Sequence, residues 1–400
     1  MARIFDKVLA DPRVRFFGNV TYGIDLRRQE LKRLYHQIVY AVGAQADRRM
    51  SIPGEDLPNS FPASSFVGWY NGHPDYRDLP ADLSCERAVV IGNGNVAMDV
   101  TRILVTSPDA LAGTDIADHA LEKLRHSKIR EVVVLGRRGP VQASFTTPEI
   151  RELGKLDGMD VIVDPRNLRL EAASKSELDE DPHRQGESEN SGRLCCPRRP
   201  FRPSPHHPAL SRLAGRDHRR IWSDHGPENR AERTGHGSQW GAAVTRTRPV
   251  RGHPDRSGAA LDRLSHRADR RRAFDPATST INNIAGQVVH PNTGEVLHGE
   301  YVVGWAKRGP TGLIGNNKAD AAATVNAMVA DLPALPRLRD NRRDPSQIEE
   351  LLRERGIDYV TYADWQILDR YEVAAGRAQG RPRVKVTTVP EMMTVIREGR

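Results

Sequence analysis

The chain has 400 residues, enough for two or three domains, and its 38% hydrophobic content can form a core although the mean hydropathy is −0.59. Its three cysteines are too few for a disulfide framework and favour a reducing cytoplasm, and no apolar run approaches the roughly 20 residues that span a bilayer. The formal net charge of +8 would by itself suggest an acidic or nucleic-acid partner.

The N-terminal region is predicted to contain short strands, turns and a connector. Val14–Phe17 has the composition of a strand, Gly18-Asn19 that of a turn, and Ile38–Gly43 that of a buried strand ending in glycine. Residues 51–84 contain several Pro and Gly turn pairs, which predicts a loop-rich connector.

Residues 87–164 alternate between strand and helix patterns. In chain order the sequence predicts the strand Ala88–Ile91, the helix Val96–Val105, a helix over 118–126, the strand Glu131–Leu135, a helix from Thr147 and the strand Asp160–Val163. Such alternation is typical of a parallel sheet with helices on both faces.

The segment 183–272 interrupts this pattern. It contains 20 arginines, no lysine and 9 acidic residues, so it accounts for more than the whole net charge of the chain. No helical or strand period persists, and too little apolar surface is available to offset the entropy of the chain. We predict that the segment is disordered and read off-frame between two compensating frameshifts, because GC-rich DNA read off-frame encodes Arg, Pro, His and Ser but little Lys. A basic arm that binds nucleic acid is the rival interpretation.

Regular structure is predicted to return near Phe274. The expected elements are the strand Tyr301–Trp305, a Gly/Pro loop at Gly309–Gly315 and an Ala-rich helix at Asn317–Val329. A linker at 331–343 precedes a C-terminal unit, with helical patterns near 346–355 and 363–375 and an extended stretch at Val384–Val389.

One glycine-rich turn fits a nucleotide-binding motif. The run Gly92-Asn93-Gly94-Asn95-Val96-Ala97 matches G-x-G-x-x-G/A, follows an apolar strand and opens a helix. The first glycine makes the tight turn, the second lets the backbone approach a pyrophosphate, and Ala97 permits close packing of the helix on the strand. The free N–H groups of the helix N-terminus then attract phosphate. An ordinary Gly-rich turn is the alternative.

The next predicted strand ends in Gly136-Arg137-Arg138-Gly139. A site specific for NAD places an acidic residue at the end of this strand, whereas arginine suits the 2′-phosphate of NADPH. The pair therefore favours NADPH, unless both arginines are simply solvated at the surface.

Several longer runs resemble the adrenodoxin-reductase family of NADPH–ferredoxin reductases. They are Phe66–Gly72, Gly92–Leu104, Thr114–Asp118, Gly136–Pro140 and Gly304–Gly315. In that family a hydride passes from NADPH to FAD, and single electrons then pass to an iron–sulfur protein. The resemblance implies an α/β fold of the flavoprotein type with two dinucleotide-binding domains. One is a Rossmann-like NADP-binding domain, and the other is a partial FAD-binding domain. The disordered basic segment is an addition to these two domains.

The resemblance also implies roles for individual residues in the NADPH site. The pyrophosphate would be held by Asn93, Gly94, Asn95 and Val96, and the 2′-phosphate by Arg137 and Arg138. Glu149 matches a carboxylate near the nicotinamide side of the pocket. Its alternative role is that of an acidic residue in the first turn of a helix, where the helix dipole favours it.

The implied flavin contacts lie mostly near the C-terminal side of the chain. They are Trp305, Gly312, Leu313 and Ile314, and backbone N–H groups there can stabilise negative charge on reduced flavin. Tyr22 stands where the family uses a backbone contact to the adenine of FAD, and Trp305 could instead be a plain core residue. No catalytic side chain and no metal ligand is expected, because the cofactors carry the chemistry.

Two features depart from the family. Its members begin with a separate Gly-rich strand–turn–helix that binds the FAD pyrophosphate, and residues 1–50 contain only isolated glycines, so we expect an N-terminal truncation. The segment 183–272 stands where the family has ordinary α/β sequence. The sequence thus predicts a partial FAD-binding domain at 1–84, an NADP-binding domain at 85–182, the disordered segment at 183–272, a return to the FAD domain at 273–330 and a small C-terminal unit at 331–400.

The predicted function is that of a cytoplasmic NADPH–ferredoxin oxidoreductase that uses FAD, with ferredoxin or an adrenodoxin-like iron–sulfur protein as its partner. The alternative is an inactive remnant that retains only an NADPH-binding domain. An enzyme resembling thioredoxin reductase is excluded, because it needs a C-x-x-C pair and the sequence has only the adjacent Cys195-Cys196.

Overall fold

The computed structural model describes residues 2–43, 49–136, 143–164, 280–309, 314–335 and 344–400, together with the backbone of 209–215, 243–245 and 274–275. The chain divides into two compact units, each of which mixes helices and strands. Unit 1 comprises Met1–Ala46, Pro254–Arg370 and Val395–Arg400, and unit 2 comprises Asp47–His253 and Tyr371–Thr394. No helix in the described ranges combines the length and the apolar character that crossing a bilayer requires.

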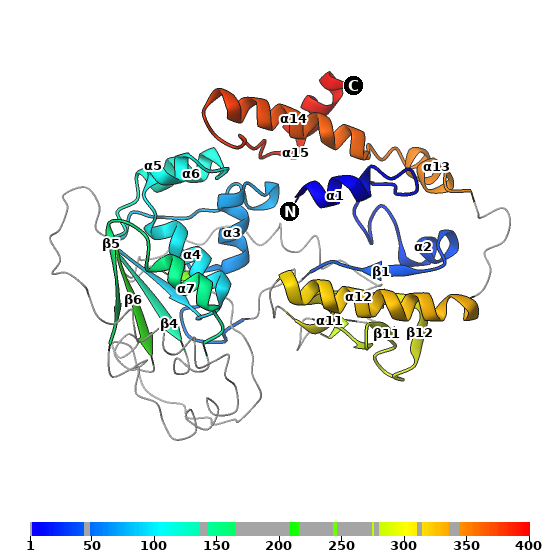
Figure 1. Cartoon of the computed structure of the whole chain (residues 1–400), viewed down its shortest axis with the longest axis horizontal. Coiled ribbons are helices and arrows are strands. Elements are labelled where there is room, and N and C mark those ends of the chain that lie inside the picture. Colours follow the sequence, from blue (N-terminus) through cyan, green and yellow to red (C-terminus); the bar gives the residue numbers. More distant parts are fainter. Residues whose placement is uncertain are drawn as a thin grey trace. The chain divides into compact units, whose positions relative to one another are not determined.

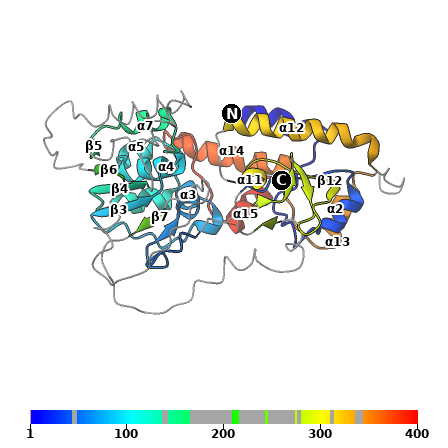
Figure 2. The same cartoon turned by 90° about the horizontal axis from the view of Figure 1, so that it is seen from below.

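Unit 2 contains a six-stranded sheet with the order β2-β7-β3-β4-β6-β5. Its strands are β2 (Phe61–Pro62), β3 (Arg87–Ile91), β4 (Glu131–Gly136), β5 (Met159–Val163), β6 (Ala209–Gly215) and β7 (Ala243–Thr245). Strands β3, β4, β6 and β5 are parallel, whereas β7 runs antiparallel to both of its neighbours. The parallel pairing predicted from the alternating pattern is therefore confirmed for β3 and β4, which lie side by side in Figure 2.

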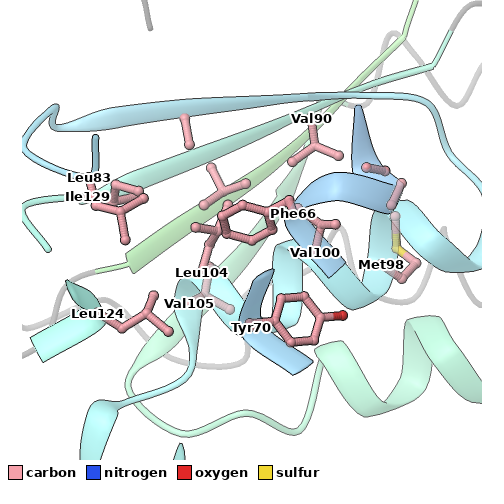
Figure 3. Packing of buried hydrophobic residues seen from close by; sticks show 14 of the residues in the cluster. Phe66, Tyr70, Leu83, Val90, Met98, Val100, Leu104, Val105, Leu124 and Ile129 are labelled. Carbon is pink, nitrogen blue, oxygen red and sulfur yellow. The ribbon is translucent and has the colours of Figure 1, made fainter. Parts of the chain in front are cut away.

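The core of unit 2 lies between this sheet and its helices. The helices are α3 (Ala63–Asn71), α4 (Asn95–Val105), α5 (Pro108–Ala112), α6 (Asp118–Arg125) and α7 (Thr147–Leu153). The middle of β3 is a continuous apolar run, as expected for a parallel strand that is covered on both faces. Figure 3 shows Phe66 of α3 and Val100 of α4 among the buried side chains packed against the strands.

Residues 47–84 fall in unit 2, whereas the sequence analysis assigns them to the partial FAD-binding domain. The part predicted to be a connector contains α3, whose Phe66, Trp69 and Tyr70 are all buried in the core of unit 2. Gly72 ends this helix in the left-handed region, with φ 78°. A nine-residue helix is marginal by itself, so its stability comes from burying this aromatic face.

Two stretches of the segment 183–272 are strands, where the sequence predicts no regular structure. Strand β6 pairs with β4 and β5, and β7 pairs with β3 and β2. Both strands are interior to the sheet, so main-chain hydrogen bonds on two sides can hold them without any side-chain period. The rest of the segment lies outside the described residues, and its disorder stays a prediction.

Unit 1 contains a four-stranded sheet with the order β1-β12-β11-β10, in which β1 and β12 are parallel. Its strands are β1 (Ile38–Tyr40), β10 (Asn283–Ile284), β11 (Gln287–Val289) and β12 (Val296–Val302), and β8 (Phe274–Asp275) pairs separately with β9 (Thr280–Ile281). The helices are α1 (Ala2–Leu9), α2 (Arg28–Leu34), α11 (Trp305–Arg308), α12 (Ile314–Asp331) and α13 (Gln347–Glu354). Figure 1 shows α12 lying along β11 and β12.

A buried carboxylate links β12 to α2 within unit 1. Glu300 is 1% exposed, and Arg28 donates two hydrogen bonds to it while the ammonium of Lys32 lies 3.0 Å away. The hydroxyl of Tyr40 on β1 donates a third hydrogen bond of 2.9 Å. Burial acts to raise the pKa of Glu300, but these cations outweigh it and lower the pKa, so the group is held as a carboxylate.

The ends of the chain depart from the predicted elements. Val14–Phe17 is not a strand, and Trp305 begins α11 instead of ending a strand. Helix α14 (Tyr362–Ala378) confirms the helical pattern near 363–375, whereas α15 (Val389–Gly399) is not predicted from the sequence. Within unit 2 the buried Arg381 donates to the carbonyls of Thr114 and Ile116, which fixes the C-terminal segment by contacts that no local pattern reveals.

Replacing Phe66 with alanine tests the role of α3 in the core. The variant should lower the free energy of unfolding by about 3–5 kcal/mol, because a fully buried phenyl ring is lost and a cavity remains. The matched control is Phe5→Ala, since Phe5 is 61% exposed and its loss should change the free energy by about 0.5 kcal/mol or less. Equal effects in urea denaturation would contradict the placement of α3.

Candidate functional site

The glycine-rich turn of unit 2 lies at the carboxyl end of β3. Gly92 has φ 125°, a conformation that favours glycine, and its N–H donates to the carbonyl of Leu135 on β4. Gly94 is the N-cap of α4 and offers no side-chain cap. The first N–H groups of α4 are therefore open to a ligand, and an anion is the ligand that such a helix end prefers.

The turn is tied to the segment that leads into α7. The carbonyl of Asn93 accepts hydrogen bonds from the N–H groups of Ser144 and Phe145, each 3.0 Å long. The side-chain oxygen of Asn95 accepts a 2.8 Å hydrogen bond from the N–H of Thr146. The side chain of Asn95 thus ties the start of α4 to the residue before α7.

The predicted phosphate-binding residues are placed only in part. Asn93, Gly94, Asn95 and Val96 lie together at the turn, as the motif predicts. Arg137 and Arg138 lie outside the described residues. Strand β4, which precedes the two arginines in the sequence, ends at Gly136. Its Leu135 pairs in register with Ile91, the last residue of β3. Strand β4 therefore ends at the same edge of the sheet as the glycine-rich turn.

Glu149 lies in the first turn of α7 within a cluster of charged groups. Arg102 of α4 donates a 3.3 Å hydrogen bond to Glu149 and a 2.5 Å hydrogen bond to Glu152, and it also pairs with Asp99. Burial and the negative charge of Asp99 raise the pKa of Glu149, and Arg102 opposes both effects. Arg102 is not among the site residues predicted from the sequence, because a contact between residues about 50 positions apart leaves no periodic pattern.

Unit 1 contains a cavity of about 310 Å³ at the carboxyl ends of its parallel strands. This size lies at the lower end of the roughly 300–1,000 Å³ typical of small-molecule sites. Gly43 and Gly304 both have positive φ, and a Cβ added to either would meet no atom within 4 Å. The lining residues come from the ends of β1 and β12 and from one face of α12: Ala41, Gly43, Val303, Gly304, Trp305, Asn317 and Ala321.

The predicted flavin contacts are brought together only in part. Trp305 lines the cavity, and its indole Nε1 is buried without a hydrogen-bond partner in the described structure. Ile314 is the first residue of α12, whereas Gly312 and Leu313 lie outside the described residues. Tyr22 is 44% exposed and donates a 3.4 Å hydrogen bond to the hydroxyl of Tyr40.

Asp320 contacts Gly304 of the cavity lining and is not among the residues predicted from the sequence. From α12 its carboxylate accepts a 3.3 Å hydrogen bond from the N–H of Gly304 and lies 2.7 Å from the ammonium of Lys307. Burial acts to raise the pKa of Asp320, but Lys307 outweighs it and lowers the pKa. The only signal in the sequence is an acidic residue in an Ala-rich helix, which an exposed helix face would also show.

Comparisons with known proteins identify relatives along nearly the whole chain, although no family model matches. The chain is 42% identical over 412 residues to NADPH-ferredoxin reductase FprA of Mycobacterium tuberculosis, which covers 99% of this chain and 86% of the relative. It is 36% identical over 412 residues to the mitochondrial NADPH:adrenodoxin oxidoreductase of Bos taurus, with coverage of 98% and 80%. The solved structure of M. tuberculosis FprA in complex with NADPH matches with a TM-score of 0.74 and 39% identity over 100% of this chain and 86% of that chain. The chain therefore belongs to the adrenodoxin-reductase-type family of NADPH–ferredoxin reductases.

Proposed function

We propose that this protein is an NADPH–ferredoxin oxidoreductase that takes a hydride from NADPH onto FAD and passes single electrons to an iron–sulfur protein. The observation that carries the proposal is the turn between β3 and α4, where a glycine with φ 125° precedes a helix without a side-chain cap. Relatives that are 42% and 36% identical are named as an NADPH-ferredoxin reductase and an NADPH:adrenodoxin oxidoreductase.

Unit 2 is the Rossmann-like, NADP-binding part in this proposal. The backbone at Asn93, Gly94, Asn95 and Val96 binds the pyrophosphate, because the open N–H groups of α4 point from the carboxyl edge of a parallel sheet. Arg137 and Arg138 bind the 2′-phosphate, since guanidinium forks match phosphate oxygens. Glu149 would lie near the nicotinamide side of the pocket.

Unit 1 is the FAD-binding part, and its cavity fits a flavin ring in two respects. Trp305 presents a buried indole N–H that lacks a partner in the described structure and could donate to a ring oxygen or nitrogen. The glycines at 43 and 304 leave open the space that side chains would fill. By the family resemblance, the backbone of Gly312, Leu313 and Ile314 would hold the same group, and Tyr22 would contact its adenine through the backbone. When bound, FAD supplies the conversion between two-electron and one-electron transfer.

The partner of the enzyme is a ferredoxin or an adrenodoxin-like iron–sulfur protein. The cytoplasmic location that the cysteine content favours belongs to the same proposal. No step requires a nucleophilic side chain, because the protein contributes binding, orientation and electrostatics while the cofactors carry the hydride and the electrons.

The direct test is made on the purified full chain. Flavin absorbance, oxidation of NADPH and electron transfer to a ferredoxin should all be present. A chain without bound flavin, which neither binds nor oxidises NADPH, would be the inactive remnant that the sequence analysis keeps as its alternative.

Substitution of the arginine pair tests the choice of cofactor. Arg137→Ala and Arg138→Ala should each raise the KM for NADPH by about tenfold to hundredfold, as expected for loss of a charge-assisted hydrogen bond. The KM for NADH should not change, because NADH lacks the 2′-phosphate. Arg130→Ala serves as the control, since Arg130 is exposed and precedes β4. Equal effects on NADPH and NADH would contradict the assignment.

Filling the cavity of unit 1 tests the flavin site. Ala321→Leu places a larger side chain in the cavity lining and should lower the ratio of bound flavin to protein, measured by absorbance after purification. Ala322→Leu is the matched control, because Ala322 is exposed on the same helix and the change in helix propensity is the same. Full flavin content in Ala321→Leu would place the flavin elsewhere.

A further inference from the structure

The charged cluster between α4 and α7 has a geometry that the nucleotide-binding motif does not explain. Arg102 lies two turns into α4, and its guanidinium reaches three carboxylates: Asp99 on its own helix and Glu149 and Glu152 on α7. The Arg102 side chain is 30% exposed and that of Glu149 is 27% exposed, so solvent screens this contact less than it screens an open surface pair.

The same two helices are joined at their N-terminal ends by the turn. Asn95 begins α4, and its side chain accepts from the N–H of Thr146, directly before the first residue of α7. The hydrogen bond at Asn95 ties the start of α7 to α4, and Arg102 ties Glu149 and Glu152 of α7 to the same helix. Glu149 lies between these two attachments, three residues beyond Thr146.

From this arrangement we propose that Arg102 is a positioning residue, which holds the carboxylate of Glu149 at the nicotinamide end of the NADPH site. The inference rests on the proposed function, because it assigns Arg102 a role in the same site. Arg102 contacts no reacting atom in this account. It acts through Glu149, whose carboxylate would lie at the nicotinamide side of the pocket, where its negative charge would favour the positively charged ring of NADP⁺.

The charges around Glu149 determine how the loss of Arg102 would change the pKa of Glu149. Burial and Asp99 raise the pKa of Glu149, and Glu152 adds to this, whereas the guanidinium of Arg102 lowers it. From α3, the buried hydroxyl of Tyr70 has a pKa raised by burial and by Asp99, so it stays protonated and adds no charge. Removing Arg102 should therefore raise the pKa of Glu149 further, and Glu149 would lose its charge at a higher pH than in the unmodified protein.

The test measures the binding of NADP⁺ to the full chain by calorimetry across a pH series. Arg102→Met should weaken binding about tenfold at pH values between the two midpoints, where Glu149 is charged in the unmodified protein and neutral in the variant, the loss expected for one charge-assisted hydrogen bond. The deficit should shrink as the pH rises, with a midpoint above that of the unmodified protein. Arg102→Lys retains the positive charge but not the planar guanidinium fork. This variant should restore the midpoint of the pH dependence more fully than it restores the affinity for NADP⁺. Glu149→Gln should remove this pH dependence.

The control is Arg87→Met, which removes the ion pair between Arg87 and Glu131 at the amino ends of β3 and β4. It should leave both the affinity and the pH profile unchanged, and thermal unfolding of each variant should confirm that the fold is retained. Superimposable pH profiles for Arg102→Met and the unmodified chain would overturn the positioning role while leaving the proposed function intact. No binding of NADP⁺ by the unmodified chain would overturn the proposed function, and this inference with it.

Discussion

The arrangement of both candidate sites depends on parallel strand pairing. The ladders between β3 and β4 in unit 2, and between β1 and β12 in unit 1, place carboxyl ends of neighbouring strands at one edge of each sheet. In each unit the chain then turns through a glycine with positive φ, Gly92 or Gly304. Both turns lead into a helix, so backbone N–H groups collect where strand ends meet, which is where ligands bind in open α/β sheets.

Polar side chains near these turns form hydrogen bonds within the protein. The groups available to a ligand are therefore mainly backbone N–H groups. Asn95 binds the N–H of Thr146, and Asp320 binds the N–H of Gly304. Each bond fixes a helix relative to a turn and satisfies a backbone group that would otherwise need water. A site built in this way holds its geometry before a cofactor arrives, which reduces the entropy lost on binding.

The regular parts of the α/β pattern were predictable because they depend on local sequence. The continuous apolar run of β3 and the helix α4 that follows the glycine turn agree with their predicted positions within one or two residues. Helix α3 was not predicted, because the Pro and Gly turn pairs that precede it indicate a loop, and the burial of Phe66, Trp69 and Tyr70 in the core of unit 2 stabilises so short a helix. Trp305 was placed at the end of a strand, but the positive φ of Gly304 breaks the strand one residue earlier and turns Trp305 into α11.

The sequence by itself determined the glycine-rich turn between β3 and α4, the position of the arginine pair after β4 and the family, because each depends on neighbouring residues and their order. The tertiary structure decided which side chains support that turn. Arg102 meets Glu149 across 47 positions, and Asp320 meets Gly304 across 16. Such pairs form only when two helices or a helix and a turn pack together, and an ion pair between distant residues has no spacing rule that a sequence could display.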